Sequence, residues 1–157
     1  MAKPNNLCCI LDSDVLLNWL TQEEDPLANI ILWDAPHKIM RLIEYGSVEG
    51  HTTLINLMEI RFVLRRKKGL SERTIRELLN KLLLLVKVII PDEINLLEAH
   101  GLQEEIPLSP VDAIILGVAS SLKDRHALLI TRDKELASAS KGVVTVLTPE
   151  NFLKTIK

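Results

Sequence analysis

The chain has 157 residues, of which 47% are hydrophobic and 3% aromatic, and its 19 Lys+Arg and 21 Asp+Glu give a formal net charge of −2. This length and composition predict one soluble globular domain that forms an adequate core without disulfide or metal staples. The near-neutral charge excludes a strongly basic coat for nucleic acid and an acidic disordered tail, although a local basic patch is compatible with this total.

Hydropathy and cysteine usage predict a cytoplasmic protein without a membrane-spanning or export segment. The first apolar segment, 7–11, runs directly into Asp12, and the longer apolar segments further along are interrupted by charged residues. Cys8 and Cys9 are neighbours in this segment, so a strand there directs them to opposite faces, and we expect both to be reduced core residues. The histidines show no spacing typical of a zinc site.

Taken in chain order, short apolar stretches alternate with longer segments of helical period. The predicted strands lie at about 7–11, 51–53, 86–90, 127–131 and 143–147. The predicted helices that follow the second strand lie at about 54–68, 71–85, 93–104, 110–123 and 151–156. This alternation is typical of an α/β fold with a mostly parallel sheet, and the continuously apolar strands indicate helices on both faces.

The stretch between the first and second predicted strands is too long for a simple crossover connection. It contains two apparent helices and a polar break at 22–26. We interpret residues 22–50, approximately, as a helical insertion or arm of the same domain.

Asp12 and Asp133 each follow a predicted strand, which places both at the carboxyl edge of the predicted sheet. That edge is where open α/β sheets bind their ligands. The structural alternative is that each aspartate only caps the helix that follows it. The residues alone leave both interpretations open.

Glu59 and Asp112 lie in predicted helices, in line with apolar residues. Phe62 and Val63 follow Glu59 by three and four positions, so the pattern places this carboxylate on an apolar stripe, where acids are seldom buried unpaired. A buried salt bridge to an arginine is the structural alternative for Glu59. For Asp112 the alternative is a capping box, with Ser109 as the N-cap.

Four acids that converge on one pocket need a compensating cation. At an effective dielectric constant near 20, two carboxylates about 4 Å apart repel each other by about 4 kcal/mol. A divalent cation removes this cost, and a ligand set of carboxylate oxygens, without His or Cys, favours Mg²⁺ or Mn²⁺. The sequence therefore predicts metal-assisted phosphoryl chemistry.

Four segments of the sequence together resemble PIN-domain nucleases. In chain order they are LCCILDSDVLLNWL, INLMEIRFVLRR, LSPVDAIILGVAS and LLITRDKEL. The resemblance extends from residue 7 to about residue 153, and the end of the chain looks like the final strand and helix of VapC-type toxins of toxin–antitoxin pairs. It implies a single PIN-like nuclease domain at 1–157, a three-layer α/β/α sandwich with a central, mostly parallel sheet of four to five strands.

This resemblance implies a metal-dependent endoribonuclease that hydrolyses RNA phosphodiester bonds. The positions that match its catalytic acids, which hold one or two Mg²⁺ or Mn²⁺ ions, are Asp12, Glu59, Asp112 and Asp133. The positions expected to support these ligands from behind are Ser13, Asp14, Thr131 and Glu135. The resemblance also implies an antitoxin protein as a partner and a homodimer.

Basic residues close to Glu59 are the candidates for binding RNA. Arg61 and Arg65 lie one helical turn apart, which makes them the stronger candidates for phosphate contacts that position RNA without reading its sequence. Lys67 and Lys68 fit a solvated helix end, where they interact favourably with the helix dipole.

Two other functions compete with the nuclease interpretation. One is a catalytically silent PIN-fold module that binds RNA or protein, in which the acids serve as a dock for an arginine-bearing antitoxin or for a larger RNA-processing assembly. The sequence DSDV at 12–15 also resembles the first motif of haloacid-dehalogenase-type phosphatases, but the later motifs of that class do not follow Thr131 and Asp133.

Overall fold

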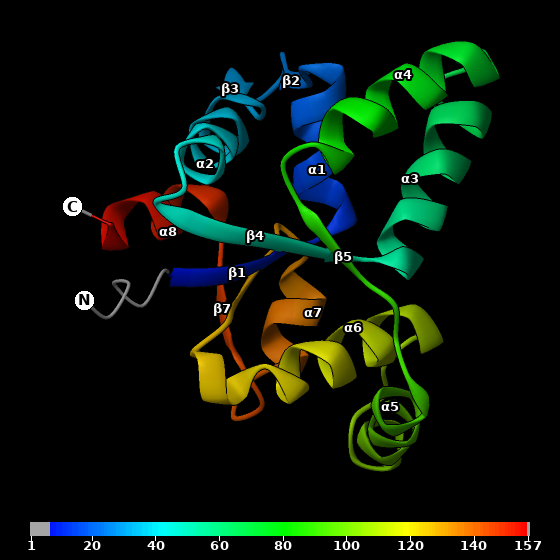
Figure 1. Ribbon diagram of the computed structural model, residues 1–157, viewed down its shortest axis with the longest axis vertical. Coiled ribbons are helices and arrows are strands. Elements are labelled where there is room, and N and C mark those ends of the chain that lie inside the picture. Colours follow the sequence, from blue (N-terminus) through cyan, green and yellow to red (C-terminus); the bar gives the residue numbers. More distant parts are fainter. Residues whose placement is uncertain (1–6, 157) are drawn as a thin grey trace.

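The computed structural model describes residues 7–156, which form a five-stranded parallel sheet between two layers of helices (Figure 1). The strands of this sheet are β1 (Leu7–Leu11), β4 (Val48–Thr53), β5 (Lys87–Ile89), β6 (Leu128–Ile130) and β7 (Thr145–Leu147). Their order is β5-β4-β1-β6-β7, and every neighbouring pair is parallel. The predicted three-layer α/β/α sandwich with a parallel central sheet is therefore confirmed.

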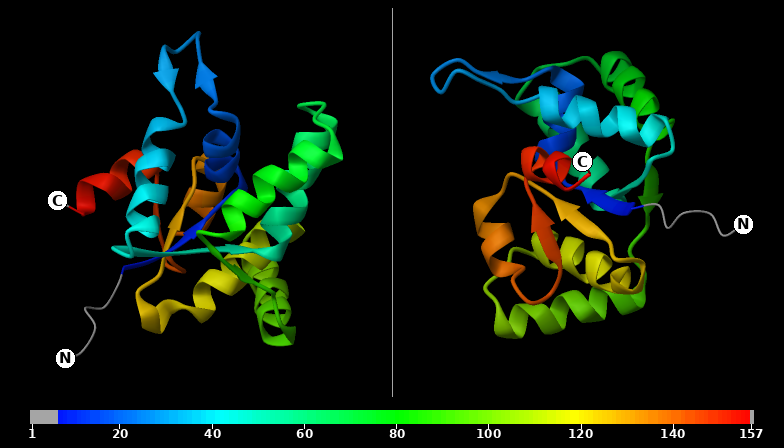
Figure 2. Two further views of the ribbon diagram at one scale, coloured as in Figure 1. Left: turned by 45° about the horizontal axis from the view of Figure 1, so that its top comes forward. Right: turned by 90° about the vertical axis from the view of Figure 1, so that its left-hand side faces the viewer.

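Helices cover both faces of this sheet. They are α1 (Ser13–Thr21), α2 (Asp34–Glu44), α3 (Leu54–Arg66), α4 (Glu72–Leu83), α5 (Glu93–Glu105), α6 (Pro110–Ser121), the 3₁₀ helix η1 (Lys123–Arg125), α7 (Lys134–Ala139) and α8 (Pro149–Thr155). α1, α2, α3, α4 and α8 pack on one face, and α6 and α7 pack on the other, with α5 against α6 (Figures 1 and 2). None of the helices in the described part of the chain is long and apolar enough to cross a lipid bilayer.

Successive side chains of β1 enter different cores, because residues of a strand alternate between its two faces. Cys9 and Leu11 belong to the larger core under α1 to α4 and α8, whereas Ile10 packs with α6 and α7. Cys8 and Cys9 are both buried and free. The prediction that they are core residues is confirmed, and their reduced state stays a prediction.

The segment predicted as a helical arm is helical only in its second half. Two short antiparallel strands, β2 (Glu24–Asp25) and β3 (Ile30–Ile31), form a hairpin before α2, and this hairpin projects from the body of the protein (Figure 2, right). Asn29 lies in its turn with a φ of 51°, a left-handed conformation that asparagine tolerates better than most residues. The hairpin was not predicted from the sequence, because strands of two residues show no recognisable alternation.

α6 approaches α5 closely because a glycine faces the neighbouring backbone. A Cβ atom added to Gly117 would lie 2.6 Å from the carbonyl oxygen of Asn95, a distance that a real side chain does not tolerate. Gly117 therefore allows the two helices to pack against each other. This packing sets the position of α6, whose first turn carries Asp112.

An ion-pair cluster lies at the amino ends of the strands, away from the strand-end acids. A Glu49 oxygen lies 2.8 Å from Nε2 of His51, and the Glu49 carboxylate accepts hydrogen bonds from Lys87 Nζ at 3.1 Å and from Arg125 Nη2 at 2.7 Å. Mainly through the hydrogen bond from Arg125, the pKa of Glu49 is lowered to about 2. The cluster connects β4, β5 and η1.

Glu49→Gln is expected to lower the free energy of unfolding by about 1–2 kcal/mol at neutral pH, a modest value because solvent screens the exposed Lys87 and Arg125. The pKa of Glu49 lies below its ordinary value of 4.5 in the folded protein, so this stabilisation is present above pH 4.5 and is lost as the pH falls toward about 2. In urea unfolding, the difference between Glu49→Gln and wild type should shrink by more than about half between pH 7 and pH 3. Glu77→Gln, which removes an exposed pair with Arg73, is the control, and an undiminished difference at pH 3 would contradict this assignment.

Candidate active site

Three chain segments meet at the carboxyl edge of the sheet, because β1, β4 and β6 are adjacent and parallel. Asp12 follows β1, Thr131 follows β6, and the Asp12 N–H donates to the carbonyl oxygen of Ile130 at 3.0 Å. α3 follows β4 directly and carries Asn56 and Glu59. Asp12 therefore lies beside the segments that follow β4 and β6.

Asp12 is a buried carboxylate that three donors hold in place. Its Oδ1 accepts hydrogen bonds from the Ser13 N–H at 2.8 Å and from Asn56 Nδ2 at 3.0 Å, and its Oδ2 accepts one from Thr131 Oγ1 at 2.7 Å. Asp12 also caps α1, as the structural alternative predicted, and it is 7% exposed. Burial, and second the carboxylate of Asp14, raise the pKa of Asp12 to about 7. Capping a helix does not require a buried carboxylate whose pKa is raised in this way. Residues with strongly shifted pKa values are common at functional sites.

Asp14 supplies a second carboxylate beside Asp12. Its Oδ1 accepts from the Val15 N–H at 2.6 Å, and its Oδ2 accepts from the Arg132 N–H at 2.8 Å. The hydroxyl of Thr131 lies between the two acids, at 2.7 Å from Asp12 Oδ2 and 3.3 Å from Asp14 Oδ2. Burial raises the pKa of Asp14 in spite of these hydrogen bonds. Two carboxylates are thus held side by side, and neither forms an ion pair within residues 7–156, although the charge of Arg132 acts on Asp14.

Glu59 reaches the same place from α3, but from an exposed side of that helix. Ser13 Oγ donates to Glu59 Oε2 at 2.5 Å. The buried side of α3 carries Ile60 and Leu64, whereas Phe62 is 59% exposed. The predicted placement of Glu59 on a buried apolar stripe is wrong, because α3 is apolar on more than one side and a different side faces the core. The alternative of a buried salt bridge is also wrong, since Glu59 forms no ion pair within residues 7–156.

Asp112 and Asp133 have capping contacts in this arrangement. Asp112 is half-buried in the first turn of α6, and its Oδ2 accepts from Ser109 Oγ at 2.8 Å. Asp133 is exposed, and its Oδ1 accepts from the N–H groups of Glu135 at 2.9 Å and Leu136 at 3.0 Å. Both capping roles had been predicted as alternatives. Among the described residues, Glu135 contacts the site region through this backbone N–H alone.

The four acids predicted as ligands do not form a closed cluster. Within residues 7–156, no three side chains of His, Cys, Asp or Glu are grouped so that they could hold one metal ion. The predicted residues that the structure does bring together are Asp12, Ser13, Asp14, Glu59 and Thr131. One carboxylate oxygen on each of three acids accepts no hydrogen bond from the described residues; these are Glu59 Oε1, Asp112 Oδ1 and Asp133 Oδ2.

Asn56 is a site residue that the sequence analysis missed. Its Nδ2 donates to Asp12 Oδ1 at 3.0 Å and lies 2.9 Å from Ser13 Oγ. Its Oδ1 and backbone form a capping box with Thr53 at the start of α3. The T-x-x-N spacing at the end of a predicted strand is the signal that identifies such a residue.

Arg132 is the second missed residue, and it connects the site to three other elements. Its guanidinium donates to Asn18 Oδ1 of α1 at 2.9 Å and to the carbonyl oxygen of Leu32, after the hairpin, at 2.9 Å. It also donates to both carboxylate oxygens of Glu150 in α8, at 3.0 and 2.7 Å. Because the Arg132 N–H also donates to Asp14 Oδ2, Arg132 helps to position Asp14 relative to these elements.

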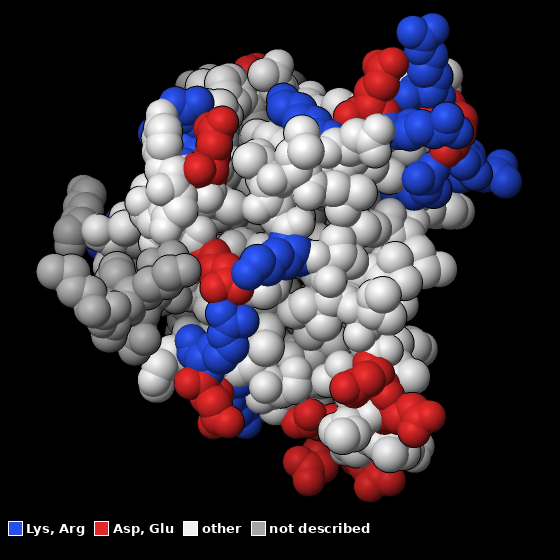
Figure 3. Space-filling model, viewed as in Figure 1, with Lys and Arg blue, Asp and Glu red and all other residues white. Residues whose placement is uncertain are grey.

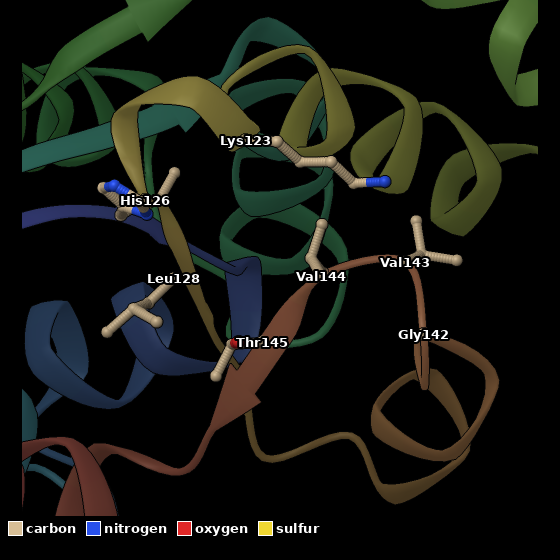
Figure 4. A pocket seen from close by; sticks show the side chains of 8 residues that line it. Lys123, His126, Leu128, Gly142, Val143, Val144 and Thr145 are labelled. Carbon is tan, nitrogen blue, oxygen red and sulfur yellow. The ribbon is translucent and has the colours of Figure 1, made fainter.

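A pocket of about 490 Å³ lies beside the acids. Its lining residues are Ser13, Asp14, Leu17, Asn18, Glu23, Glu59, Val63, Lys67 and Lys68. A second pocket, of about 430 Å³, lies at the amino ends of β6 and β7, where Lys123 and His126 line it (Figure 4). No acid lines the second pocket, so the first is the candidate active site.

Charge is distributed unevenly over the surface. Basic side chains gather over the end of α3 and over α4, whereas acidic side chains gather over α5 (Figure 3). Arg61 and Arg65, the predicted RNA contacts, both pair with Glu72 of α4. Neither of them lines the pocket beside the acids.

Comparison with known proteins identifies the family. The sequence model of the PIN-domain family matches residues 9–142 of the chain. No curated protein sequence matches the chain. Among solved structures, the chain is similar to VapBC2 from Rickettsia felis bound to a promoter DNA fragment, with a TM-score of 0.70, 12% identity, and coverage of 90% of this chain and 98% of that chain.

Two further structures are similar over most of their length. For DNA-bound VapBC from Salmonella typhimurium the TM-score is 0.67 at 16% identity, with 91% of this chain and 98% of that chain covered. For a toxin–antitoxin complex from Klebsiella pneumoniae the TM-score is 0.60 at 20% identity, with 90% of this chain and 97% of that chain covered. At such identities the likeness shows the fold. The family match leaves the phosphatase alternative without support.

Proposed function

Since the chain belongs to the PIN-domain family, we propose that it is an Mg²⁺- or Mn²⁺-dependent endoribonuclease that hydrolyses RNA phosphodiester bonds. The observation that carries this proposal is the buried carboxylate of Asp12, which lies beside Asp14, forms no ion pair within residues 7–156 and has a pKa raised to about 7. Such an arrangement costs stability unless a bound cation offsets the charge.

The donor atoms at this edge of the sheet suit a hard divalent cation. They are carboxylate and hydroxyl oxygens, without histidine or cysteine. The residues that would hold one or two ions are Asp12, Glu59, Asp112 and Asp133, and those that would support them are Ser13, Asp14, Thr131 and Glu135. Glu59, Asp112 and Asp133 each have one carboxylate oxygen that accepts no hydrogen bond from the described residues, which is compatible with this ligand role.

Hydrogen bonds within the protein preorganise the carboxylate of Asp12. Ser13, Asn56 and Thr131 hold both oxygens of Asp12, so this carboxylate needs no reorganisation during the reaction. A bound cation would supply Lewis-acid activation of water and offset the charge that develops on the phosphate. In the hydrolysis, the water oxygen forms a bond to phosphorus and gives up a proton to solvent, the bond from phosphorus to the leaving ribose oxygen breaks, and that oxygen takes up a proton from solvent.

Cleavage of mixed single-stranded and structured RNAs with Mn²⁺, Mg²⁺ or EDTA tests this proposal. Wild type should cleave only with a metal ion, and Asp112→Asn, which keeps the shape of the side chain, should not cleave. Asp34→Asn changes an exposed acid on α2 and is the matched control. Cleavage in EDTA, or cleavage retained by Asp112→Asn, would contradict the proposal. Metal binding without cleavage of any RNA would favour the catalytically silent binding module.

The family and the similar structures also support a role as the toxin of a toxin–antitoxin pair, acting in the cytoplasm. One similar structure is a toxin–antitoxin complex. An antitoxin whose chain covers the pocket beside Asp14 and Glu59 would keep RNA away from the acids. Co-purification of this chain with a small protein that inhibits its RNA cleavage is the expected result.

Exposed apolar side chains on α3 and α5 favour a homodimer. Met58 and Phe62 of α3 are 60% and 59% exposed, and Ile94 and Leu97 of α5 are each 71% exposed. α3 and α5 lie on the same side of the molecule in two views (Figures 1 and 2, left). Apolar side chains exposed in this way are typical of protein interfaces.

The double variant Met58→Lys with Phe62→Lys is expected to weaken dimerisation at least about 30-fold, because it removes two apolar anchors and places like charges at the interface. Sedimentation should give twice the chain mass of 17.7 kDa for wild type and the single mass for the variant. Leu27→Lys, at a hairpin residue that is 99% exposed, should leave the dimer intact. A monomeric wild type, or a variant that remains a dimer, would refute the interface.

A further inference from the structure

Lys67 and Lys68, at the carboxyl end of α3, line the same pocket as Ser13 and Glu59. We propose that these two lysines bind the RNA phosphates next to the scissile one and thereby position the strand over the acids. This inference rests on the proposed nuclease function. The sequence pattern fitted a solvated helix end, but the pocket places both lysines beside the site.

Neither lysine is held by a close ion pair within residues 7–156. Lys67 makes no ion pair within residues 7–156. Lys68 Nζ lies 3.5 Å from a carboxylate oxygen of Glu23, and the side chains are 38% and 36% exposed. A long, exposed pair of this kind is weak, so a phosphate competes well for Lys68. Glu23 is itself held by Asn18 Nδ2 at 3.0 Å, which keeps its carboxylate at the rim of the pocket.

Arg61 and Arg65 are less suited to this role than the lysines. Both guanidinium groups bind the same carboxylate, that of Glu72, and they connect α3 to α4. A phosphate that bound them would have to displace Glu72. Phosphate contacts within the pocket are therefore assigned to Lys67 and Lys68.

The charge along the chain directs a polyanion toward this end of α3. Residues 61–81 contain eight Lys+Arg and two Glu, a net charge of +6, whereas residues 92–105 contain five acids and no Lys or Arg, a net charge of −5. These segments form the basic region over α3 and α4 and the acidic region over α5 (Figure 3). Such a field raises the rate at which RNA meets the basic side and disfavours approach over α5.

Equilibrium binding of a short, fluorescent single-stranded RNA to the non-cleaving Asp112→Asn protein tests the inference. Adding Lys67→Gln and Lys68→Gln should weaken binding about tenfold at physiological salt and reduce the salt slope of the binding constant by about 1.4, as expected for two phosphate contacts. Adding Arg73→Gln and Arg76→Gln instead removes the same charge from α4, outside the pocket, and should retain most of the affinity. An equal loss in both variants, or no loss in the lysine variant, would overturn the inference.

Competition and kinetics separate the remaining outcomes. Displacement of the RNA by polyglutamate at equal charge would overturn the assignment to RNA and indicate an acidic protein as the ligand. In cleavage assays, Lys67→Gln with Lys68→Gln should raise KM about tenfold and leave kcat nearly unchanged. Cleavage with an unchanged KM would overturn this inference alone. Lysine-dependent RNA binding by a wild-type protein that cleaves nothing would overturn the nuclease proposal alone.

Discussion

Asp12→Asn is expected to reduce metal-dependent RNA cleavage by at least about 10²-fold and, at the same time, to stabilise the metal-free protein. The asparagine keeps the shape of the side chain but removes the buried charge. Its Oδ1 can accept from the Ser13 N–H and from Asn56 Nδ2 as before. Its Nδ2 can donate to Thr131 Oγ1, whose own proton then goes to Asp14 Oδ2, 3.3 Å away. The network of hydrogen bonds therefore survives the substitution.

The sign of this stability change follows from the pKa of Asp12. In the folded protein this pKa is raised from the ordinary 3.8 to about 7, mainly by burial, so the metal-free wild type loses stability as the pH rises between these values. At pH 8 in EDTA, Asp12→Asn should be more stable by about 2 kcal/mol, or roughly 4–8 °C in Tm, and the gain should shrink toward pH 4.

Thermal unfolding in EDTA at pH 4, 6 and 8 measures this gain. Asp34→Asn removes an exposed carboxylate of α2 and should show no such trend. A less stable Asp12→Asn protein at pH 8 would mean that Asp12 is a structural cap whose charge the fold requires.

Arg132→Ala is expected to cost about 2–3 kcal/mol of unfolding free energy, or roughly 4–10 °C in Tm. The substitution removes every side-chain hydrogen bond of Arg132 and leaves Asn18 and Glu150 without this partner. It also releases the carbonyl oxygen of Leu32, which follows the hairpin. The hairpin should therefore be cut more rapidly in limited proteolysis.

Two further variants make this prediction specific. Arg132→Lys keeps the charge but lacks the planar fork that binds both oxygens of Glu150, so it should recover less than half of the loss. Arg76→Ala removes an exposed arginine of α4 and should change neither Tm nor proteolysis. An Arg132→Ala protein with wild-type Tm and a protected hairpin would show that these contacts do not hold the arm.

The parallel sheet and the strand-end position of Asp12 could be predicted from the sequence because each depends on local patterns. The segment 7–11 is continuously apolar, as a strand covered on both faces must be, and the acid directly after it can only lie at the carboxyl edge. Thr131 follows β6 in the same way. The position of a residue that directly follows a strand can therefore be predicted from the pattern of that strand.

The orientation of α3 was not predictable, because this helix carries more apolar residues than its own core can cover. Ile60 and Leu64 face the sheet, whereas Met58 and Phe62 remain exposed. Both sets have helical spacing, so periodicity alone does not reveal which one is buried within the chain. The error in the placement of Glu59 arose from this ambiguity.

Arg132 was not predictable because its partners lie far away along the sequence. Its contacts join it to Asn18 and Leu32, which precede it by 114 and 100 residues. The sequence carries no local signal for such a contact. The joint role of Asp112 and Asp133 as ligands likewise depends on groups from separate helices, and it stays a prediction.

Titration calorimetry of Mn²⁺ into wild type and Asp12→Asn tests most directly whether the acids form a metal site, because it does not depend on choosing the right RNA. A metal site formed by these acids predicts saturable binding of one or two ions to wild type, loss of that binding in Asp12→Asn, and weaker binding in Asp133→Asn. Absence of Mn²⁺ and Mg²⁺ binding by folded wild type, or equal binding by Asp12→Asn, would contradict it.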